Sequence, residues 1–171
     1  MNLFRAILAS LVIMFSAVHA WALSDSEIAE VLMTANEAEI DAGKVAKSKA
    51  ADKTVKDFAE HMVSEHEENK KEGKKITKDE KISTKSNDTA KDLKKEAKEK
   101  LSDLKKKKGK DFDLAYIQNQ INMHQQLLTD LEQKYIPQAQ NPQFKNFLNE
   151  TKTHVEQHLA KAKEVEATLT K

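Results

Sequence analysis

The chain has 171 residues, with 29 Lys or Arg, 28 Asp or Glu and no cysteine. This charge balance argues against electrostatic attraction to nucleic acid, and the lack of cysteine excludes disulfides, a lipid-anchoring cysteine and a cysteine nucleophile. There are only 3 glycines and 2 prolines. Because strands need turns rich in these residues, the chain is predicted to be all-α.

The first residues have the layout of a secretory signal peptide. Arg5 precedes an apolar run at residues 6–17, and small residues surround Ala20, as expected near a cleavage site. The run is shorter than the roughly 20 residues of a spanning helix, which disfavours an uncleaved membrane anchor. We therefore expect residues 1–22 to be removed on export to the periplasm, and residues 23–171 to form one domain with no transmembrane span.

The first helix of the mature chain is predicted to begin at a capping box, Ser24 to Glu27, and to run to about Lys49. Its apolar residues recur every three or four positions, which is typical of a helix with one buried face. Glu39 lies within that face, about 40° from its centre at 100° per residue. A carboxylate is therefore expected in or near the core.

The second predicted helix is capped by Asp52 and runs to about Lys71. His66 lies near the centre of its apolar face, where a titratable ring is unusual. His61 and Glu65 point elsewhere and are expected to be solvated.

Residues 70–110 are rich in lysine, with acidic residues interleaved. We expect a loop at residues 76–88 and a polar helix at residues 89–107. One interpretation is a solvated helical crossover between the second and third core helices. The alternative is a patch for peripheral contact with anionic lipid or polysaccharide of the envelope.

The third core helix is predicted from Asp111, as its cap, to Tyr135. Its apolar face is interrupted near the middle by His124. Ile136 and Pro137 are expected to end the helix, because a residue before proline is pushed out of the helical region.

The fourth core helix is predicted to begin at Asn141 and Pro142, a capping asparagine followed by proline at the first helical position. His158 interrupts its apolar face, and His154 lies one turn earlier at the edge of the same face. Four such amphipathic helices predict a four-helix bundle.

The core histidines and Glu39 are expected to meet if the Lys-rich segment crosses the length of the bundle. At about 1.5 Å of rise per residue, Glu39, His66, His124 and His158 then lie within one helical turn of the same level. Three imidazoles and a carboxylate form a ligand set that suits zinc and tolerates copper, nickel or iron, and His154 could contribute as well. The alternatives are a metal-free hydrogen-bonded network and a fold in which these residues do not meet.

Other site chemistries are poorly supported. A carboxylate-bridged di-metal centre needs a glutamate three residues before a ligating histidine, but Val63, Ile121 and Val155 occupy those positions. There is no Gly-rich phosphate loop and no serine in a nucleophile-elbow motif. No enzymatic activity is assigned on this basis.

Four segments carry a resemblance to a known family: Asn36–Gly43, Val55–His66, Phe112–Tyr116 and His158–Leu159. With them the chain resembles the bacterial exported family called domain of unknown function 4142. The resemblance implies a ferritin-like fold and a periplasmic or outer-membrane location, and its motif positions are Glu39, His66, His124 and His158. His154 and the long Lys-rich segment depart from the family pattern.

These features favour a protein that sequesters or senses one transition-metal ion, with a role in stress as one setting. The alternative is a structural envelope protein that uses the Lys-rich segment and needs no metal.

Overall fold

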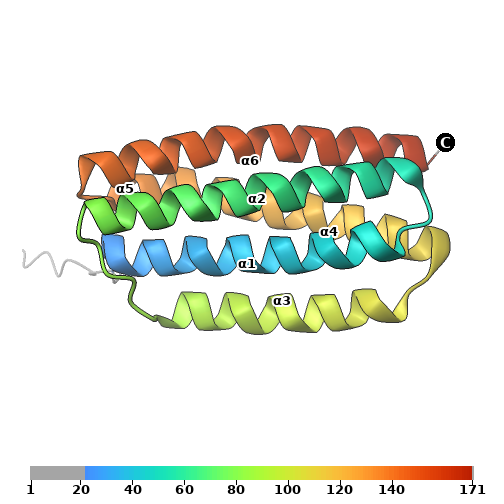
Figure 1. Cartoon of the computed structure of the whole chain (residues 1–171), viewed down its shortest axis with the longest axis horizontal. Coiled ribbons are helices and arrows are strands. Elements are labelled where there is room, and N and C mark those ends of the chain that lie inside the picture. Colours follow the sequence, from blue (N-terminus) through green and yellow to red (C-terminus); the bar gives the residue numbers. More distant parts are fainter. Residues whose placement is uncertain (1–21, 171) are drawn as a thin grey trace, which may run out of the picture.

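The computed structural model describes residues 22–170, and within this range the chain is helical and contains no strand. Five long helices lie lengthwise beside one another (Figure 1), joined by short connections. The prediction of an all-α chain is therefore confirmed for these residues, whereas the predicted signal peptide falls almost entirely outside them. In chain order the elements are α1 (Asp25–Lys49), α2 (Lys53–Asp79), α3 (Asp88–Lys106), α4 (Gly109–Asp130), the π-helical turn η1 (Leu131–Tyr135), α5 (Ile136–Gln138) and α6 (Pro142–Leu169).

Two hydrophobic clusters fill the space between α1, α2, α4 and α6, one toward each end of these helices. Phe58, Phe112 and Tyr116 belong to the first cluster, and Phe144 and Leu148 belong to the second. Most of the buried polar residues lie along the helices between the two clusters, so they form a polar layer across the middle of the core; Thr77 and Asp113 lie outside it. Its members are Asn36, Glu39, His66, Asn69, Gln120, His124, Thr151 and His158.

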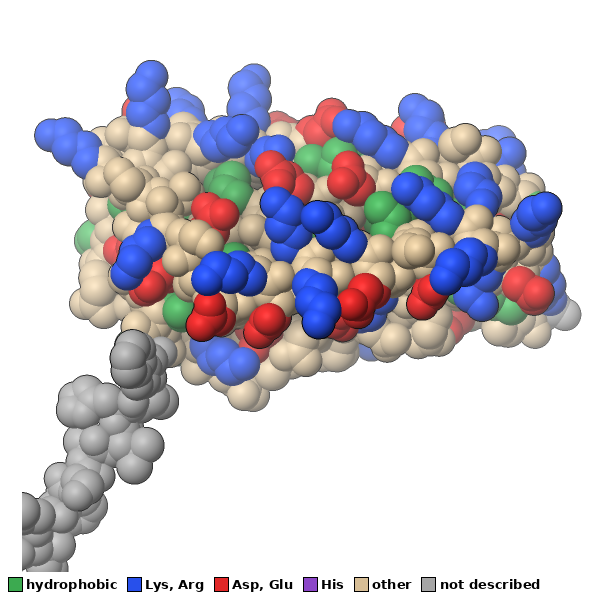
Figure 2. Space-filling view, turned by 90° about the horizontal axis from the view of Figure 1, so that it is seen from below, with side chains coloured by type: hydrophobic (Ala, Val, Ile, Leu, Met, Phe, Trp, Pro, Cys, Tyr) green, Lys and Arg blue, Asp and Glu red, His purple; other side chains and the backbone are tan. Residues whose placement is uncertain are grey.

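Helix α3 lies outside this core, against α1 and α4. Only Ala90 and Leu104 of its side chains are buried, so it contributes little to the core. The face of the molecule that includes α3 carries lysines and acidic residues side by side (Figure 2). Each ion pair within α3, such as Lys100 with Glu96 at 2.7 Å, joins residues three or four apart on the helix surface.

The α2 helix extends to Asp79, beyond the predicted end at about Lys71, so the loop predicted at residues 76–88 is too long. Packing explains the difference. Gly73 lets Phe147 and Met33 approach the helix closely, since a Cβ there would lie 3.0 Å from Phe147 Cζ and 2.5 Å from Met33 Cε. One turn later Thr77 is buried, and its hydroxyl donates to the Gly73 carbonyl at 2.9 Å.

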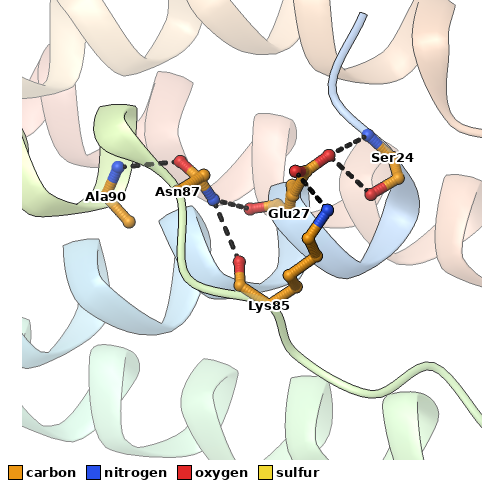
Figure 3. A network of polar contacts seen from close by, with 5 residues as sticks. All are labelled: Ser24, Glu27, Lys85, Asn87 and Ala90. Carbon is orange, nitrogen blue, oxygen red and sulfur yellow. Dashed lines mark hydrogen bonds and ion pairs between the residues drawn. The ribbon is translucent and has the colours of Figure 1, made fainter.

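Polar contacts tie the segment between α2 and α3 to the start of α1 (Figure 3). Glu27 accepts a hydrogen bond from the Ser24 amide at 3.0 Å, which fulfils the predicted capping box, and its other oxygen pairs with Lys85 at 3.1 Å. Asn87 donates to the Glu27 carbonyl at 3.0 Å and accepts from the Ala90 amide at 2.9 Å. The asparagine therefore caps α3 and attaches its first turn to α1.

The third core helix differs from its prediction at both ends. It begins at Gly109 without a cap from Asp111, and Ile136 and Pro137 do not end it. The chain passes through η1, where the Ile136 amide donates to the Leu131 carbonyl five residues back. This wider turn alters the hydrogen-bond register just before Pro137, so that the proline falls in the first turn of α5, where its missing N–H is tolerated.

At each end of the helical array, a carboxylate accepts hydrogen bonds from the backbone of a turn between helices. Asp113 in α4 accepts hydrogen bonds from the Ala51 and Asp52 amides at 3.0 and 2.8 Å, in the turn between α1 and α2. Asp25 at the start of α1 accepts from the Gln140 and Asn141 amides at 3.0 and 2.8 Å, in the turn before α6. These four amides have no partner within a helix, and the carboxylates satisfy them.

Within residues 22–170, no helix combines the length and the apolar character that crossing a membrane requires.

Candidate metal centre

Three histidines from three different helices meet in the polar layer. His66 comes from α2, His124 from α4 and His158 from α6, and their side chains are 6%, 2% and 4% exposed. Their ring centroids are 5.3 to 5.7 Å apart, and one ring nitrogen of each lies within 4.8 Å of the others. The structure therefore brings together three of the predicted ligands.

A chain of hydrogen bonds fixes the orientation of His66. Its Nδ1 lies 2.9 Å from the Asn36 side-chain oxygen, and Asn36 donates in turn to the Leu32 carbonyl and to the Asn69 side-chain oxygen. Asn69 then donates to the Thr151 hydroxyl at 3.0 Å. Because the Leu32 carbonyl can only accept, the Asn36 amide is oriented with its oxygen toward His66, and Nδ1 of His66 must donate.

The same logic fixes the tautomer of His124. Its Nδ1 lies 2.9 Å from the Gln120 backbone carbonyl, which can only accept. Both histidines therefore carry their proton on Nδ1 and present the lone pair of Nε2 to the interior. This is the arrangement in which metal-binding histidines are held by hydrogen bonds from the opposite ring nitrogen.

The nitrogens that face the interior have no hydrogen-bond partner among the described residues. They are His66 Nε2, His124 Nε2 and His158 Nδ1, and all three are buried. Buried polar atoms are nearly always paired, because an unpaired one costs about 1–3 kcal/mol. Three such atoms in one place therefore single out this cluster as a site that can hold a cation.

Burial keeps two of the rings neutral. Desolvation, reinforced by the neighbouring His124 and His158, lowers the pKa of His66 well below its usual 6.5. Desolvation, with smaller contributions from His124, His61 and His154, lowers the pKa of His158 to about 3. Neutral imidazole is the form that ligates a metal ion, so these two rings are ready to bind at neutral pH.

The carboxylate of Glu39 lies in the same layer but is not part of the histidine group. Gln120 donates to it at 2.7 Å, so Gln120 links Glu39 to the helix that carries His124. Tyr116 is also buried nearby, and its pKa is raised well above 10.0 by burial and by the charge of Glu39. The structure thus places Glu39 beside the centre, where its charge can act without direct coordination.

The predicted ligand His154 is half-buried and lies outside the histidine group. It lines a cavity of about 410 Å³ together with Glu39 and the three histidines. The cavity extends to Asp130 and to Tyr135 in η1, and α3 contributes Leu93 and Ala97 to its wall. A molecule in this cavity would therefore be next to any ion held by the three rings.

Three residues that orient the site were not singled out from the sequence as functional. Asn36, Asn69 and Gln120 are polar residues at helical spacings from the site: three before Glu39, three after His66 and four before His124. Residues so spaced share one helical face. A search for polar residues one turn away from each candidate ligand would have found all three.

The fold and the site describe an all-helical protein with a buried cluster of three histidines. The family described as "Domain of unknown function (DUF4142)" matches residues 13–165. The chain belongs to this family, as its sequence motifs predicted. No curated protein and no solved structure matches the chain.

Proposed function

We propose that this protein binds one divalent transition-metal ion, zinc in the first place, through His66, His124 and His158, and serves in metal sequestration or sensing. The observation that carries the proposal is the convergence of three buried histidines. One ring nitrogen of each lies within 4.8 Å of the others, and each ring has a buried nitrogen without a hydrogen-bond partner among the described residues. Zinc binds imidazole nitrogen, and copper, nickel and iron accept the same ligand.

The surroundings support this assignment over a metal-free polar network. In such a network the buried nitrogens would be satisfied by donors, whereas here the available hydrogen bonds go to the opposite sides of the His66 and His124 rings. The nearby carboxylate of Glu39 would offset part of the charge of a divalent ion in a dry core. Three protein ligands leave a fourth position, which is typical of zinc sites that bind water or an exogenous ligand.

The setting of the proposal is an exported protein. The layout of residues 1–22 supports a cleaved signal peptide and a periplasmic location. The proposed location includes contact with the outer membrane. The order of the helices supports a ferritin-like four-helix bundle formed by α1, α2, α4 and α6, with α3 as the crossover between α2 and α4. The interspersed charges on the face that includes α3 (Figure 2) do not favour the alternative of a strongly cationic surface for anionic lipid.

The test is elemental analysis of the mature protein, purified without an affinity tag or chelator, followed by thermal unfolding with and without chelator. We expect close to one equivalent of metal and a lower Tm after chelation, because an ion that binds only the folded state stabilises it. His124→Ala should abolish stoichiometric binding. His61→Ala, which removes an exposed ring on α2, should retain it.

A wild-type protein that takes up no metal when zinc is supplied, with the same Tm in chelator, would contradict the proposal. The polar layer would then be a structural network. Equal binding by His124→Ala and wild type would also contradict it, because the ion would then be held elsewhere.

A further inference from the structure

A second group of potential metal ligands lies at the surface beside the buried histidines. His61 and Glu65, one turn apart on α2, and His158 on α6 place their ligand atoms within 4.8 Å of one another. The side chains of His61 and Glu65 are 55% and 31% exposed. The His61 ring centroid lies 5.9 Å from that of His158. An ion in solvent can therefore reach this group directly.

The surface group and the buried group share His158. A neutral imidazole has one lone pair for a metal, since its other nitrogen carries the proton. His158 can therefore complete only one of the two groups at a time. A turn of its ring, or a shift of its proton from one ring nitrogen to the other, would transfer the lone pair between them.

We propose that His61, Glu65 and His158 form an outer site that receives a divalent transition-metal ion from solvent and passes it to His66 and His124, with His158 as the shared ligand. This inference rests on the proposed function of the buried histidines. It adds an entry route and assigns roles to two residues on the surface of α2.

Burial gives such a route a purpose. His66 and His124 are 6% and 2% exposed, so an ion that binds them must exchange most of its water for protein ligands on the way. At the outer site the ion can exchange water for imidazole and carboxylate ligands in steps, and the charge of Glu65 attracts it. Glu65 also lines the cavity that contains His66 and His124, so the outer group lies at the edge of the inner one.

The proposal has a kinetic consequence that separates it from simple coordination. A residue that acts only on the route changes the rate of loading and the rate of release by the same factor, because both use the same path. The equilibrium affinity of the inner site then stays constant. A residue that holds the ion in its final position changes the affinity.

The experiment follows Co²⁺ binding to the metal-free mature protein by stopped-flow visible absorption, and release by transfer to a chelator. The variants are His61→Ala and Glu65→Gln. The control is Glu67→Gln, which removes an equal charge from an exposed position on α2 that pairs with Lys44 at 3.0 Å. We expect both outer-site variants to load and release Co²⁺ about tenfold or more slowly, the scale on which residues that support a metal site act. Their Kd should match that of wild type, and the control should match in all three quantities.

Each other result overturns the proposal in a distinct way. If wild type binds Co²⁺ and the outer-site variants load at its rate, the inner site stands and the entry route is wrong. If these variants lose affinity, His61 or Glu65 belongs to the final site. If Glu67→Gln is equally slow, general attraction by α2 explains the rates. If wild type binds neither Co²⁺ nor zinc, the proposed function fails and the route fails with it.

Discussion

Acidification should lower the free energy of unfolding of the metal-free protein more steeply than it would if all the histidines had the ordinary pKa of about 6.5. The pKa of His66 and that of His158 are both lowered by burial, the latter to about 3. Below about pH 6.5 these two rings therefore bind protons in the unfolded chain but not in the folded chain. The contribution of these rings to stability is complete above about pH 6.5 and is lost as the pH falls through their lowered pKa values, about 3 for His158.

The size of the effect follows from the two shifts. Each ring held neutral changes the free energy of unfolding by up to about 1.4 kcal/mol per pH unit below the unfolded pKa. Between about pH 7.5 and pH 5 this amounts to about 2 kcal/mol per ring and about 4 kcal/mol for both. Both rings are more than nine-tenths buried, so solvent screening reduces the effect little. Carboxyl groups with ordinary pKa values near 4 contribute mainly below this interval.

The assay is urea unfolding followed by far-UV circular dichroism, in chelator, at several pH values across that interval. His158→Gln is the matched variant, and its pH slope should be smaller by about one proton, or about 1.4 kcal/mol per pH unit. A wild-type stability that changes by less than about 1 kcal/mol between pH 7.5 and pH 5 would refute the conclusion that the two rings are held neutral.

Two further pairs of substitutions test the packing of the fold by urea unfolding. Asp113→Ala should destabilise by about 2–4 kcal/mol, because two backbone amides in the turn between α1 and α2 lose their acceptor. Asp111→Ala, at an exposed position two residues earlier, should cost less than about 0.5 kcal/mol. Equal losses would show that the turn does not depend on Asp113. Gly43→Ala should destabilise by about 1–3 kcal/mol, because the added Cβ would lie 2.7 Å from Val63 Cγ2 and 3.2 Å from the backbone oxygen of Ala59. Gly73→Ala should cost less, since the atoms it meets are ends of side chains that can move, and the reverse order would count against this account of close helix approach.

The convergence of the three histidines was predictable because helical geometry is regular. A period of 3.6 residues identified the buried faces, and a constant rise per residue placed His66, His124 and His158 at one level. The estimate of these levels also needs the direction of each helix, and it took this from one assumption, that the Lys-rich segment crosses the length of the molecule. The same arithmetic placed Glu39 at the right level, but the side-chain contact with Gln120 that directs its carboxylate depends on rotamers that periodicity does not specify.

The helix ends were less predictable, because tertiary contacts decide them. Ile76 and Thr77 are surrounded by lysines, so the sequence there predicts a loop. Their packing in α2 is a tertiary contact that this local pattern does not indicate. Pro137 is a strong local signal for a helix end, but η1 changes the register before it. His61 and Glu65 were predicted to be solvated. This is correct for His61, whereas Glu65 is half-buried. The closeness of both residues to His158 depends on how α2 and α6 pack.

The carboxylates of Asp25 and Asp113 have a consequence for how the chain unfolds. Asp25 belongs to the pair α1 and α2 and accepts from the turn before α6, whereas Asp113 belongs to the pair α4 and α6 and accepts from the turn between α1 and α2. Neither pair is therefore fully hydrogen-bonded without the other. Partial opening at either end would expose two unpaired amides and a carboxylate together. Separation of the two pairs is therefore coupled at both ends of the molecule.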